Sequence, residues 1–262
     1  MKAIASRDNA RYKALAKLVS SSKERKASGL SVLEGAHLLA AYLDAGAKPE
    51  AVAVSVTALA KTEIVALLER ASPAVITVFG GTLFDSLSSL ENAPGVIATV
   101  RTPPSKPVPR DADLALVLED IQDPGNVGTL LRSAAAAGAR HALLSPQCAF
   151  AWSPKVLRAA MGAHFALNIV EGADVEAFVR SYAGESVALV SRGGKPLWEI
   201  DLRARAAILV GNEGAGLTPR LAEAASVRAT IPLPGKVESL NAATAGAVAL
   251  FEAVRQRAGA KR

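Results

Sequence analysis

The chain is poor in cysteine and in aromatic residues. It has one cysteine, Cys148, so neither an intramolecular disulfide nor a cysteine-based zinc site can form. Aromatic residues make up 4% of the sequence, which argues against base stacking on exposed rings as the main means of binding a ligand. The three histidines, His37, His141 and His164, lie far apart and have no metal-ligand spacing. We therefore expect no metal.

Long apolar runs are also missing. A membrane-spanning helix needs ~20 apolar residues, whereas the uncharged segment 71–84 is interrupted by Pro73 and by Gly80 and Gly81. The basic N-terminus has no apolar stretch followed by a small-residue cleavage site, as a secretory signal would have. We therefore expect a cytoplasmic protein with no membrane partner.

Positive charge is concentrated at one end of the chain. Eight basic and two acidic residues lie in segment 1–30, which therefore accounts for the whole net charge of +6. A basic element on a neutral body suggests an anionic partner, usually nucleic acid. A solvated helix face is the alternative. The candidate RNA contacts on this segment are Arg7, Arg11, Lys13, Lys23, Arg25 and Lys26.

A proline-rich segment divides the chain. Four prolines between positions 103 and 109 exclude a helix or a central strand there. We expect a domain at 1–104, a linker at 105–110 and a second domain at 111–262. In the first domain, apolar periodicity predicts a small α/β unit, with helices at 8–21, 36–45 and 59–70 and strands at 31–34, 51–56, 75–79 and 95–100.

The second domain alternates more regularly between strands and helices. Its predicted strands are 114–118, 142–145, 165–170, 187–190, 207–210 and 228–231, and its predicted helices are 129–137, 155–161, 175–182, 219–225 and 242–256. Nearly continuous apolar strands that alternate with helices predict a mostly parallel sheet with helices on both faces. Ligands bind such sheets beyond the carboxyl ends of the strands.

The loop after the first of these strands contains no G-x-G turn, and the chain has no G-x-x-x-x-G-K-[ST] motif, which argues against ordinary dinucleotide and nucleoside-triphosphate sites. Asn126 stands where a helix N-cap is expected and Gly138 where a C-terminal cap is expected. Arg132 falls in the first turns of that helix, where it opposes the macrodipole, so a nearby anion would stabilise it. A surface arginine on an alanine-rich helix is the alternative.

The loop after strand 207–210 contains three glycines, Gly211, Gly214 and Gly216, around Glu213. Glycines let the backbone approach a ligand closely, and the carboxylate could accept hydrogen bonds inside the bend. Thr218 with Pro219 suits the cap and first position of the next helix. A plain turn is the alternative.

The loop after strand 228–231 runs from Pro232 to Asn241 and leads into a long helix of small and apolar residues. Ser239 and Asn241 are two polar side chains near the start of that helix. Simple N-capping by Ser239 is the alternative to a functional role.

Together, the three loops resemble the three signature motifs of the SpoU family of RNA 2′-O-ribose methyltransferases, within the knotted SPOUT class. The matches, in order along the chain, are Asn126, Gly128, Arg132 and Ala134; then Gly211, Glu213, Gly214 and Gly216; then Pro232, Gly235, Ser239, Leu240 and Asn241. Segment 1–104 more loosely resembles the family's small substrate-binding domain, which is itself similar to certain ribosomal proteins.

This resemblance implies a fold, a cofactor and an oligomeric state. The fold would be an α/β domain with a deep trefoil knot near its C-terminal end. S-adenosylmethionine would bind at the knot, without a metal, and the protein would be a homodimer. By analogy with the family, the cofactor would be held by backbone at Gly211, Gly216, Ile231, Pro232 and Leu240.

The resemblance also implies roles for the polar side chains. Arginine has a pKa above ~12 and rarely loses its proton, so we expect Arg132 to clamp a phosphate and stabilise a developing alkoxide rather than act as a base. Asn126, Ser239 and Asn241 would orient the hydroxyl or Arg132, and Glu213 would tether one of them.

The expected activity is therefore methylation of a ribose 2′-hydroxyl in structured RNA. A separate N-terminal domain favours ribosomal RNA over transfer RNA as the substrate. A non-catalytic RNA-binding or ribosome-assembly protein on the same fold is the alternative from another class. The presence of all the polar motif residues argues against it, namely Asn126, Arg132, Glu213, Ser239 and Asn241. Methylation of a base is a third reading, and the Ser-Leu-Asn motif fits ribose chemistry better.

Overall fold

The computed structural model describes residues 3–72, 74–88 and 93–259. The chain forms two compact units. The N-terminal unit comprises Met1–Pro104 and Trp152–Phe165, and the C-terminal unit comprises Ser105–Ala151 and Ala166–Arg262. The chain leaves the first unit inside the proline-rich segment. Segment 152–165, which the sequence analysis assigned to the second domain, packs with the N-terminal unit instead.

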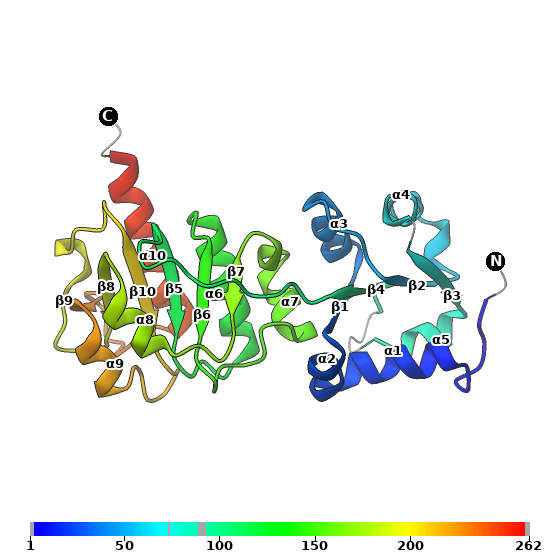
Figure 1. Cartoon of the computed structure of the whole chain (residues 1–262), viewed down its shortest axis with the longest axis horizontal. Coiled ribbons are helices and arrows are strands. Elements are labelled where there is room, and N and C mark those ends of the chain that lie inside the picture. Colours follow the sequence, from blue (N-terminus) through cyan, green and yellow to red (C-terminus); the bar gives the residue numbers. More distant parts are fainter. Residues whose placement is uncertain (1–2, 73, 89–92, 260–262) are drawn as a thin grey trace. The chain divides into compact units, whose positions relative to one another are not determined.

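The N-terminal unit is built on a four-stranded mixed sheet in the order β1-β4-β2-β3, in which only β2 and β3 pair in parallel (Figure 1). Its strands are β1 (Leu30–Glu34), β2 (Ala51–Ser55), β3 (Val75–Phe79) and β4 (Val96–Arg101). Its helices are α1 (Ala10–Ser20), α2 (Ser22–Ser28), α3 (Ala36–Asp44), η1 (Ala58–Ala60), α4 (Thr62–Ala71), α5 (Gly81–Asp85), α7 (Pro154–Ala160) and η2 (Ala163–Phe165).

Helix α1 covers one face of this sheet. Tyr12, Leu15 and Leu18 recur at three-residue spacing, so they form one stripe of the helix. That stripe is buried against Val32 of β1 and Phe79 of β3. The helix starts at Asn9, whose side chain accepts a hydrogen bond from the backbone N–H of Arg11. The predicted helix at 8–21 is thus present, but the sequence analysis missed the short α2 that follows it.

Helix α7 joins the N-terminal unit through β1. The buried Glu34 of β1 lies 3.5 Å from the guanidinium of Arg158, and Phe165 packs edge-on against Tyr42. An ion pair and a ring contact between residues more than a hundred positions apart leave no local signal in the sequence. The sequence therefore gives no indication that segment 152–165 packs with the N-terminal unit.

The C-terminal unit is built on a seven-stranded sheet in the order β7-β6-β5-β10-β8-β11-β9, in which all pairs are parallel (Figure 1). Its strands are β5 (Leu114–Leu118), β6 (His141–Leu144), β7 (Asn168–Val170), β8 (Glu185–Leu189), β9 (Lys195–Pro196), β10 (Ala206–Val210) and β11 (Val227–Thr230). Its helices are α6 (Pro124–Ala136), α8 (Val175–Ser181), η3 (Leu197–Glu199), α9 (Pro219–Ala224) and α10 (Ala242–Gly259).

Helices cover both faces of this sheet. On one face, Phe178 of α8 and Leu221 of α9 pack against Val117 of β5 and Leu209 of β10. On the other face, α10 packs on α6 and β10. Helices α6 and α10 cross closely at Gly246, where an added Cβ would lie 2.3 Å from Leu130. The prediction of a mostly parallel sheet between helices is confirmed.

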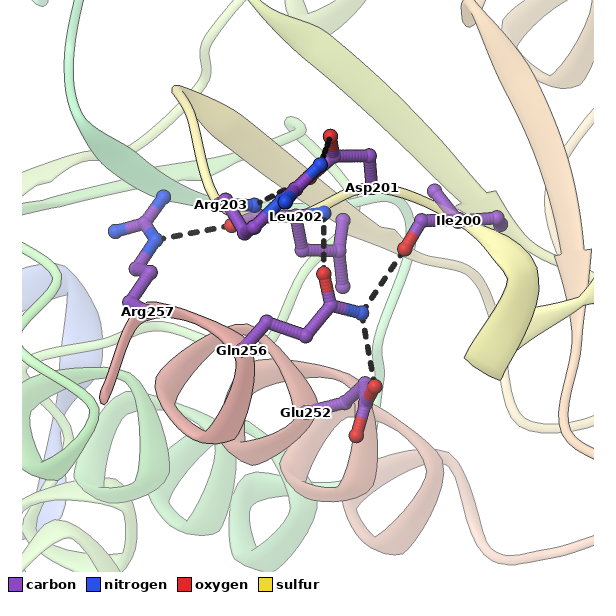
Figure 2. A network of polar contacts seen from close by, with 7 residues as sticks. All are labelled: Ile200, Asp201, Leu202, Arg203, Glu252, Gln256 and Arg257. Carbon is purple, nitrogen blue, oxygen red and sulfur yellow. Dashed lines mark hydrogen bonds and ion pairs between the residues drawn. The ribbon is translucent and has the colours of Figure 1, made fainter. Parts of the chain in front are cut away.

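Side chains near the end of α10 bind the segment that leads into β10. Figure 2 shows Gln256 accepting a hydrogen bond from the N–H of Leu202 (2.8 Å) and donating to the carbonyl of Ile200 (2.9 Å) and to Glu252 (2.8 Å). Arg257 donates to the carbonyl of Leu202 (3.0 Å). Because β10 follows directly, these bonds fix the start of the strand that carries the glycine loop at its other end.

In the described part of the chain, no helix is both long and apolar enough to cross a membrane. The described residues also contain no group of three or more His, Cys, Asp and Glu side chains placed to hold a metal ion.

Candidate active site

The site begins where α6 follows β5. Pro124 occupies the first turn of the helix, and the side chain of Asp123 caps it by accepting a hydrogen bond from the N–H of Asn126 (2.8 Å). The sequence analysis placed the cap at Asn126, which is wrong, because the helix starts one turn earlier. Asn126 is the third helical residue, so its side-chain amide is available for other contacts.

Glu213, in the glycine loop after β10, accepts three hydrogen bonds from this helix start. The donors are the side-chain amide of Asn126 (3.0 Å) and the backbone N–H groups of Asp123 (3.0 Å) and Gln122 (3.3 Å). Partial burial alone would raise the pKa of Glu213. The hydrogen bonds outweigh that effect and hold its pKa below the ordinary value. The carboxylate therefore stays ionised and fastens the second motif loop to the first.

Asn241 connects the third loop to the same group. Its side-chain amide donates to the side-chain oxygen of Asn126 (3.0 Å). Its own side-chain oxygen caps α10 by accepting from the N–H groups of Ala243 (2.9 Å) and Thr244 (3.1 Å). Asn241 is thus the cap that the sequence analysis considered for Ser239. A continuous chain of hydrogen bonds runs from Glu213 through Asn126 to Asn241.

Arg132 is separate from this chain. It lies on the exposed side of α6, nine residues after the capping residue, and its guanidinium has no hydrogen bond or ion pair within the described part of the chain. It is too far along the helix for the macrodipole to act on it strongly. An exposed, unpaired guanidinium is nevertheless suited to bind an anionic ligand such as phosphate.

A cavity of about 650 Å³ opens beside the Glu213 loop. Its walls come from the ends of β8, β10 and β11 and from the start of α10. Four of the five predicted cofactor residues, Gly211, Gly216, Ile231 and Leu240, line it, together with Glu213 and Ser239. Pro232 is exposed and is not among the lining residues, unlike its neighbours Ile231 and Leu233.

The glycine loop folds back on itself at this cavity. The N–H of Gly216 donates to the carbonyl of Asn212 (2.9 Å), and Gly216 has a φ of +72°, which other residues rarely adopt. A Cβ on Gly211 would lie 2.2 Å from the backbone of Gly216 and Leu217. The loop therefore presents mainly backbone groups to the cavity.

These walls fit an adenosine-bearing cofactor. A volume of this size lies within the range of ordinary ligand sites, which combine apolar walls with a few polar groups. Leu189, Val210, Ile231 and Leu240 supply apolar surface for a purine ring, and the glycine loop supplies backbone donors and acceptors. When bound there, S-adenosylmethionine would supply an electrophilic methyl group.

Sequence reasoning missed two residues that hold the glycine loop. Glu119, at the end of β5, is 9% exposed and accepts hydrogen bonds from the N–H (2.7 Å) and hydroxyl (2.8 Å) of Thr218. Asn212 donates to the carbonyl of Asp120 (2.8 Å). A carboxylate directly after a fully apolar strand was the available signal for Glu119. Thr218 also caps α9 as predicted.

The basic residues of the N-terminal segment differ in their surroundings. Arg7, Lys13 and Lys23 are exposed, although Lys13 pairs with Asp8 at 2.9 Å. Arg11 is exposed and donates to the hydroxyl of Thr77 (3.2 Å), and Lys26 is exposed on α2.

Arg25 does not fit its predicted role as an RNA contact. It is 5% exposed, and its guanidinium donates to the carbonyls of Leu18 and Val19 at the end of α1. Burial lowers its pKa, and the nearby Glu34 partly opposes that shift. Arg25 therefore caps a helix inside the unit and does not face a partner.

Known proteins resemble both units. Residues 113–251 match the model of the SpoU rRNA Methylase family, and residues 9–98 match that of the MRM3-like substrate binding domain. A protein of Synechocystis that is named an uncharacterized tRNA/rRNA methyltransferase is 34% identical, over 90% of this chain and 87% of the relative. The 23S rRNA guanosine 2′-O-methyltransferase RlmP of Bacillus subtilis is 31% identical, over 96% of this chain and 98% of the relative.

Solved structures of methyltransferases are similar to nearly the whole chain. The crystal structure of an RNA 2′-O ribose methyltransferase has a TM-score of 0.84 and 31% identity, covering 98% of this chain and 100% of that one. The SpoU methyltransferase AviRb of Streptomyces viridochromogenes, in complex with AdoMet, has a TM-score of 0.84 and 27% identity, covering 95% and 98%. The family model over residues 113–251 and the relatives that align over most of the chain show that it belongs to the SpoU rRNA methylase family.

Proposed function

We propose that this enzyme transfers the methyl group of S-adenosylmethionine to a ribose 2′-hydroxyl of ribosomal RNA. The observation that carries the proposal is the chain of hydrogen bonds Glu213–Asn126–Asn241, which joins the three motif loops beside a cavity of about 650 Å³. One relative that aligns over nearly the whole chain is named a 23S rRNA guanosine 2′-O-methyltransferase, and another is named rRNA methyltransferase 3, which supports ribosomal over transfer RNA.

In the reaction, a bond forms between the ribose oxygen and the methyl carbon while the carbon–sulfur bond breaks, and the hydroxyl proton is lost to water. The chain must hold the ribose in line with the methyl group, which is positioning work. Arg132 is permanently charged, so it binds the adjacent phosphate and stabilises negative charge on the oxygen. Asn126, Asn241 and the exposed Ser239 supply hydrogen bonds that orient the hydroxyl.

The exposed cations of segment 3–28 bind RNA phosphates away from the reacting ribose. The match to a substrate binding domain supports this assignment. Neutralising Arg7 and Lys23 together should weaken RNA binding and reduce the salt dependence of the binding constant by about one power of the salt concentration per lost contact. Lys61→Ala, at an exposed position before α4, is the matched control. An unchanged salt slope in the double variant would refute the assignment.

The resemblance also leads us to propose a C-terminal trefoil knot and a ribosomal-protein-like N-terminal domain. The order of the strands supports the knot, because β11 lies beyond β8 whereas the α10 that follows returns to β10 and α6. The knot would be refuted by an experimental structure in which segment 231–241 passes outside the loops at 191–194 and 211–218.

We further propose a homodimer, whose contact includes the outer face of α10. Phe251 on this helix is 48% exposed, so this face presents a large apolar side chain that a second copy would cover. Sedimentation should give twice the chain mass of 26.9 kDa, and Phe251→Asp should shift the population towards the monomer. A wild-type protein that sediments as a monomer would exclude the dimer.

Mapping of ribose 2′-O-methyl groups tests the function in the cell, and a cytoplasmic location is expected for this substrate. Ribosomal RNA from cells that lack the gene should lose methylation at one site, and the wild-type gene should restore it. The Arg132→Ala gene should not restore it, whereas Arg140→Ala, an exposed arginine just beyond α6, should. Loss of a methyl group from transfer RNA alone would refute the proposed substrate.

A further inference from the structure

Three ionisable side chains line the 650 Å³ cavity, and one of them is already engaged. Glu213 accepts hydrogen bonds from three donors that fasten the motif loops. The other two are Arg192, which follows β8, and Glu238, which precedes α10. Only Arg192 and Glu238 are therefore left to meet the charges of a ligand.

Arg192 and Glu238 face each other from separate loops. Their nearest nitrogen and oxygen atoms are 3.4 Å apart, and their side chains are 77% and 86% exposed. Charge-assisted hydrogen bonds are shorter, at about 2.7–2.9 Å, and exposed ion pairs of this kind contribute at most about 1 kcal/mol. A ligand can therefore separate the pair at little cost.

The loop that carries Arg192 is anchored on both sides. The N–H of Val190 donates to the carbonyl of Ala229 (2.8 Å), and the N–H of Gly194 donates to the hydroxyl of Thr230 (3.0 Å). A Cβ on Gly194 would lie 2.7 Å from the backbone of Ala229, so this loop is pressed against β11. Arg192 thus projects from a backbone position that is fixed before any ligand binds, which reduces the entropy lost on binding.

An adjacent, exposed cation and anion in the lining of this cavity match one ligand chemistry. An α-amino acid group carries a carboxylate and an ammonium a few ångströms apart. We propose that Arg192 and Glu238 form the subsite for the amino-acid end of S-adenosylmethionine, with the guanidinium on its carboxylate and Glu238 on its ammonium. This inference rests on the proposed function, since it takes the cofactor from there.

Binding of two probes tests the subsite directly. S-adenosylhomocysteine keeps the amino-acid group, whereas 5′-methylthioadenosine lacks it, and calorimetry measures the affinity of the full-length protein for each. Arg192→Ala and Glu238→Gln should each weaken the binding of S-adenosylhomocysteine about tenfold, or 1.4 kcal/mol. Neither variant should change the affinity for 5′-methylthioadenosine. Arg192→Lys should recover part of the loss. Lys236→Ala, an exposed cation outside the cavity lining on the same loop as Glu238, is the matched control.

Each other outcome overturns the inference. Equal weakening of both probes would mean that Arg192 only supports the shape of the site. Unchanged S-adenosylhomocysteine affinity in Arg192→Ala, with weaker RNA binding, would make Arg192 a phosphate contact instead. A wild-type protein that binds neither probe would refute the proposed cofactor itself, whereas binding unaffected by either variant would refute only this subsite.

Discussion

Replacing Glu213 by glutamine tests whether one carboxylate holds the motif loops together. The charged oxygens of Glu213 accept hydrogen bonds from Gln122, Asp123 and Asn126. A glutamine keeps one acceptor oxygen, which can serve two of these donors, but it turns an NH₂ group towards the third. Hydrogen bonds to a charged group contribute about 1.5–3 kcal/mol and neutral ones about 0.5–1.5 kcal/mol.

Because Glu213 is exposed, water screens much of that difference. We therefore expect Glu213→Gln to lower the free energy of unfolding at pH 7 by about 1–2 kcal/mol, measured by urea denaturation. Glu223→Gln, at an exposed position on α9, should change it by less than about 0.5 kcal/mol.

The pH dependence gives an independent check. The pKa of Glu213 is lower in the folded protein than its ordinary value. The unfolded chain therefore binds a proton more readily, and the stabilisation by Glu213 is present above the unfolded pKa of about 4.3. It is lost as the pH falls through the folded pKa. The difference in stability between the wild type and Glu213→Gln should stay constant above about pH 5.5 and shrink below pH 4. Curves that remain parallel down to pH 3 would refute the role of the charge.

Three further substitutions test other parts of the account. Gly211→Ala places a Cβ 2.2 Å from backbone atoms and should weaken S-adenosylhomocysteine binding more than tenfold. Gly235→Ala, with open space around it, should leave that binding unchanged. Equal affinities of the two variants would contradict the loop geometry. Gln256→Leu leaves the N–H of the fully buried Leu202 without its partner and should lower the free energy of unfolding, measured by urea denaturation, by about 2–4 kcal/mol. A decrease below about 0.5 kcal/mol would show that the contacts in Figure 2 contribute little to stability. Arg25→Met removes the hydrogen-bond donor to two carbonyls at the end of α1. It should lower the melting temperature without changing the RNA affinity of the folded protein. Weaker RNA binding by the folded variant would show that Arg25 contacts RNA.

Local patterns in the sequence predicted most of the secondary structure. Strand β5 starts and ends where its five apolar residues do, at Leu114 and Leu118, because a fully buried parallel strand must be apolar throughout. Thr218 with Pro219 predicted the start of α9. The strand expected at 165–170 was too long, since η2 ends at Phe165 and β7 begins at Asn168. Apolar residues stand on both sides of Asn168 in this segment, so hydrophobicity alone does not separate a 3₁₀ turn from a strand.

The parts that were missed depend on contacts between distant residues. Glu119 holds Thr218, which lies 99 positions away, and no local pattern connects the two. Asp123 and Asn126 are both good capping residues three positions apart, and the choice between them depended on Pro124, which favours the first turn of a helix. A count of charges could not separate the buried Arg25 from its exposed neighbours, since that distinction arises from the packing of α2 against α1.

In the proposed reaction, Arg132 acts on the ribose while the cavity binds the cofactor independently. The most direct measurement is methyl transfer from radiolabelled S-adenosylmethionine to unmodified ribosomal RNA by the purified chain, followed by nuclease mapping of the product. The wild type should label one ribose 2′-oxygen, and Arg132→Ala should lose about 10²–10³-fold in rate while its affinity for S-adenosylhomocysteine stays unchanged. Label on a base, or a variant rate within a few-fold of the wild type, would contradict the account.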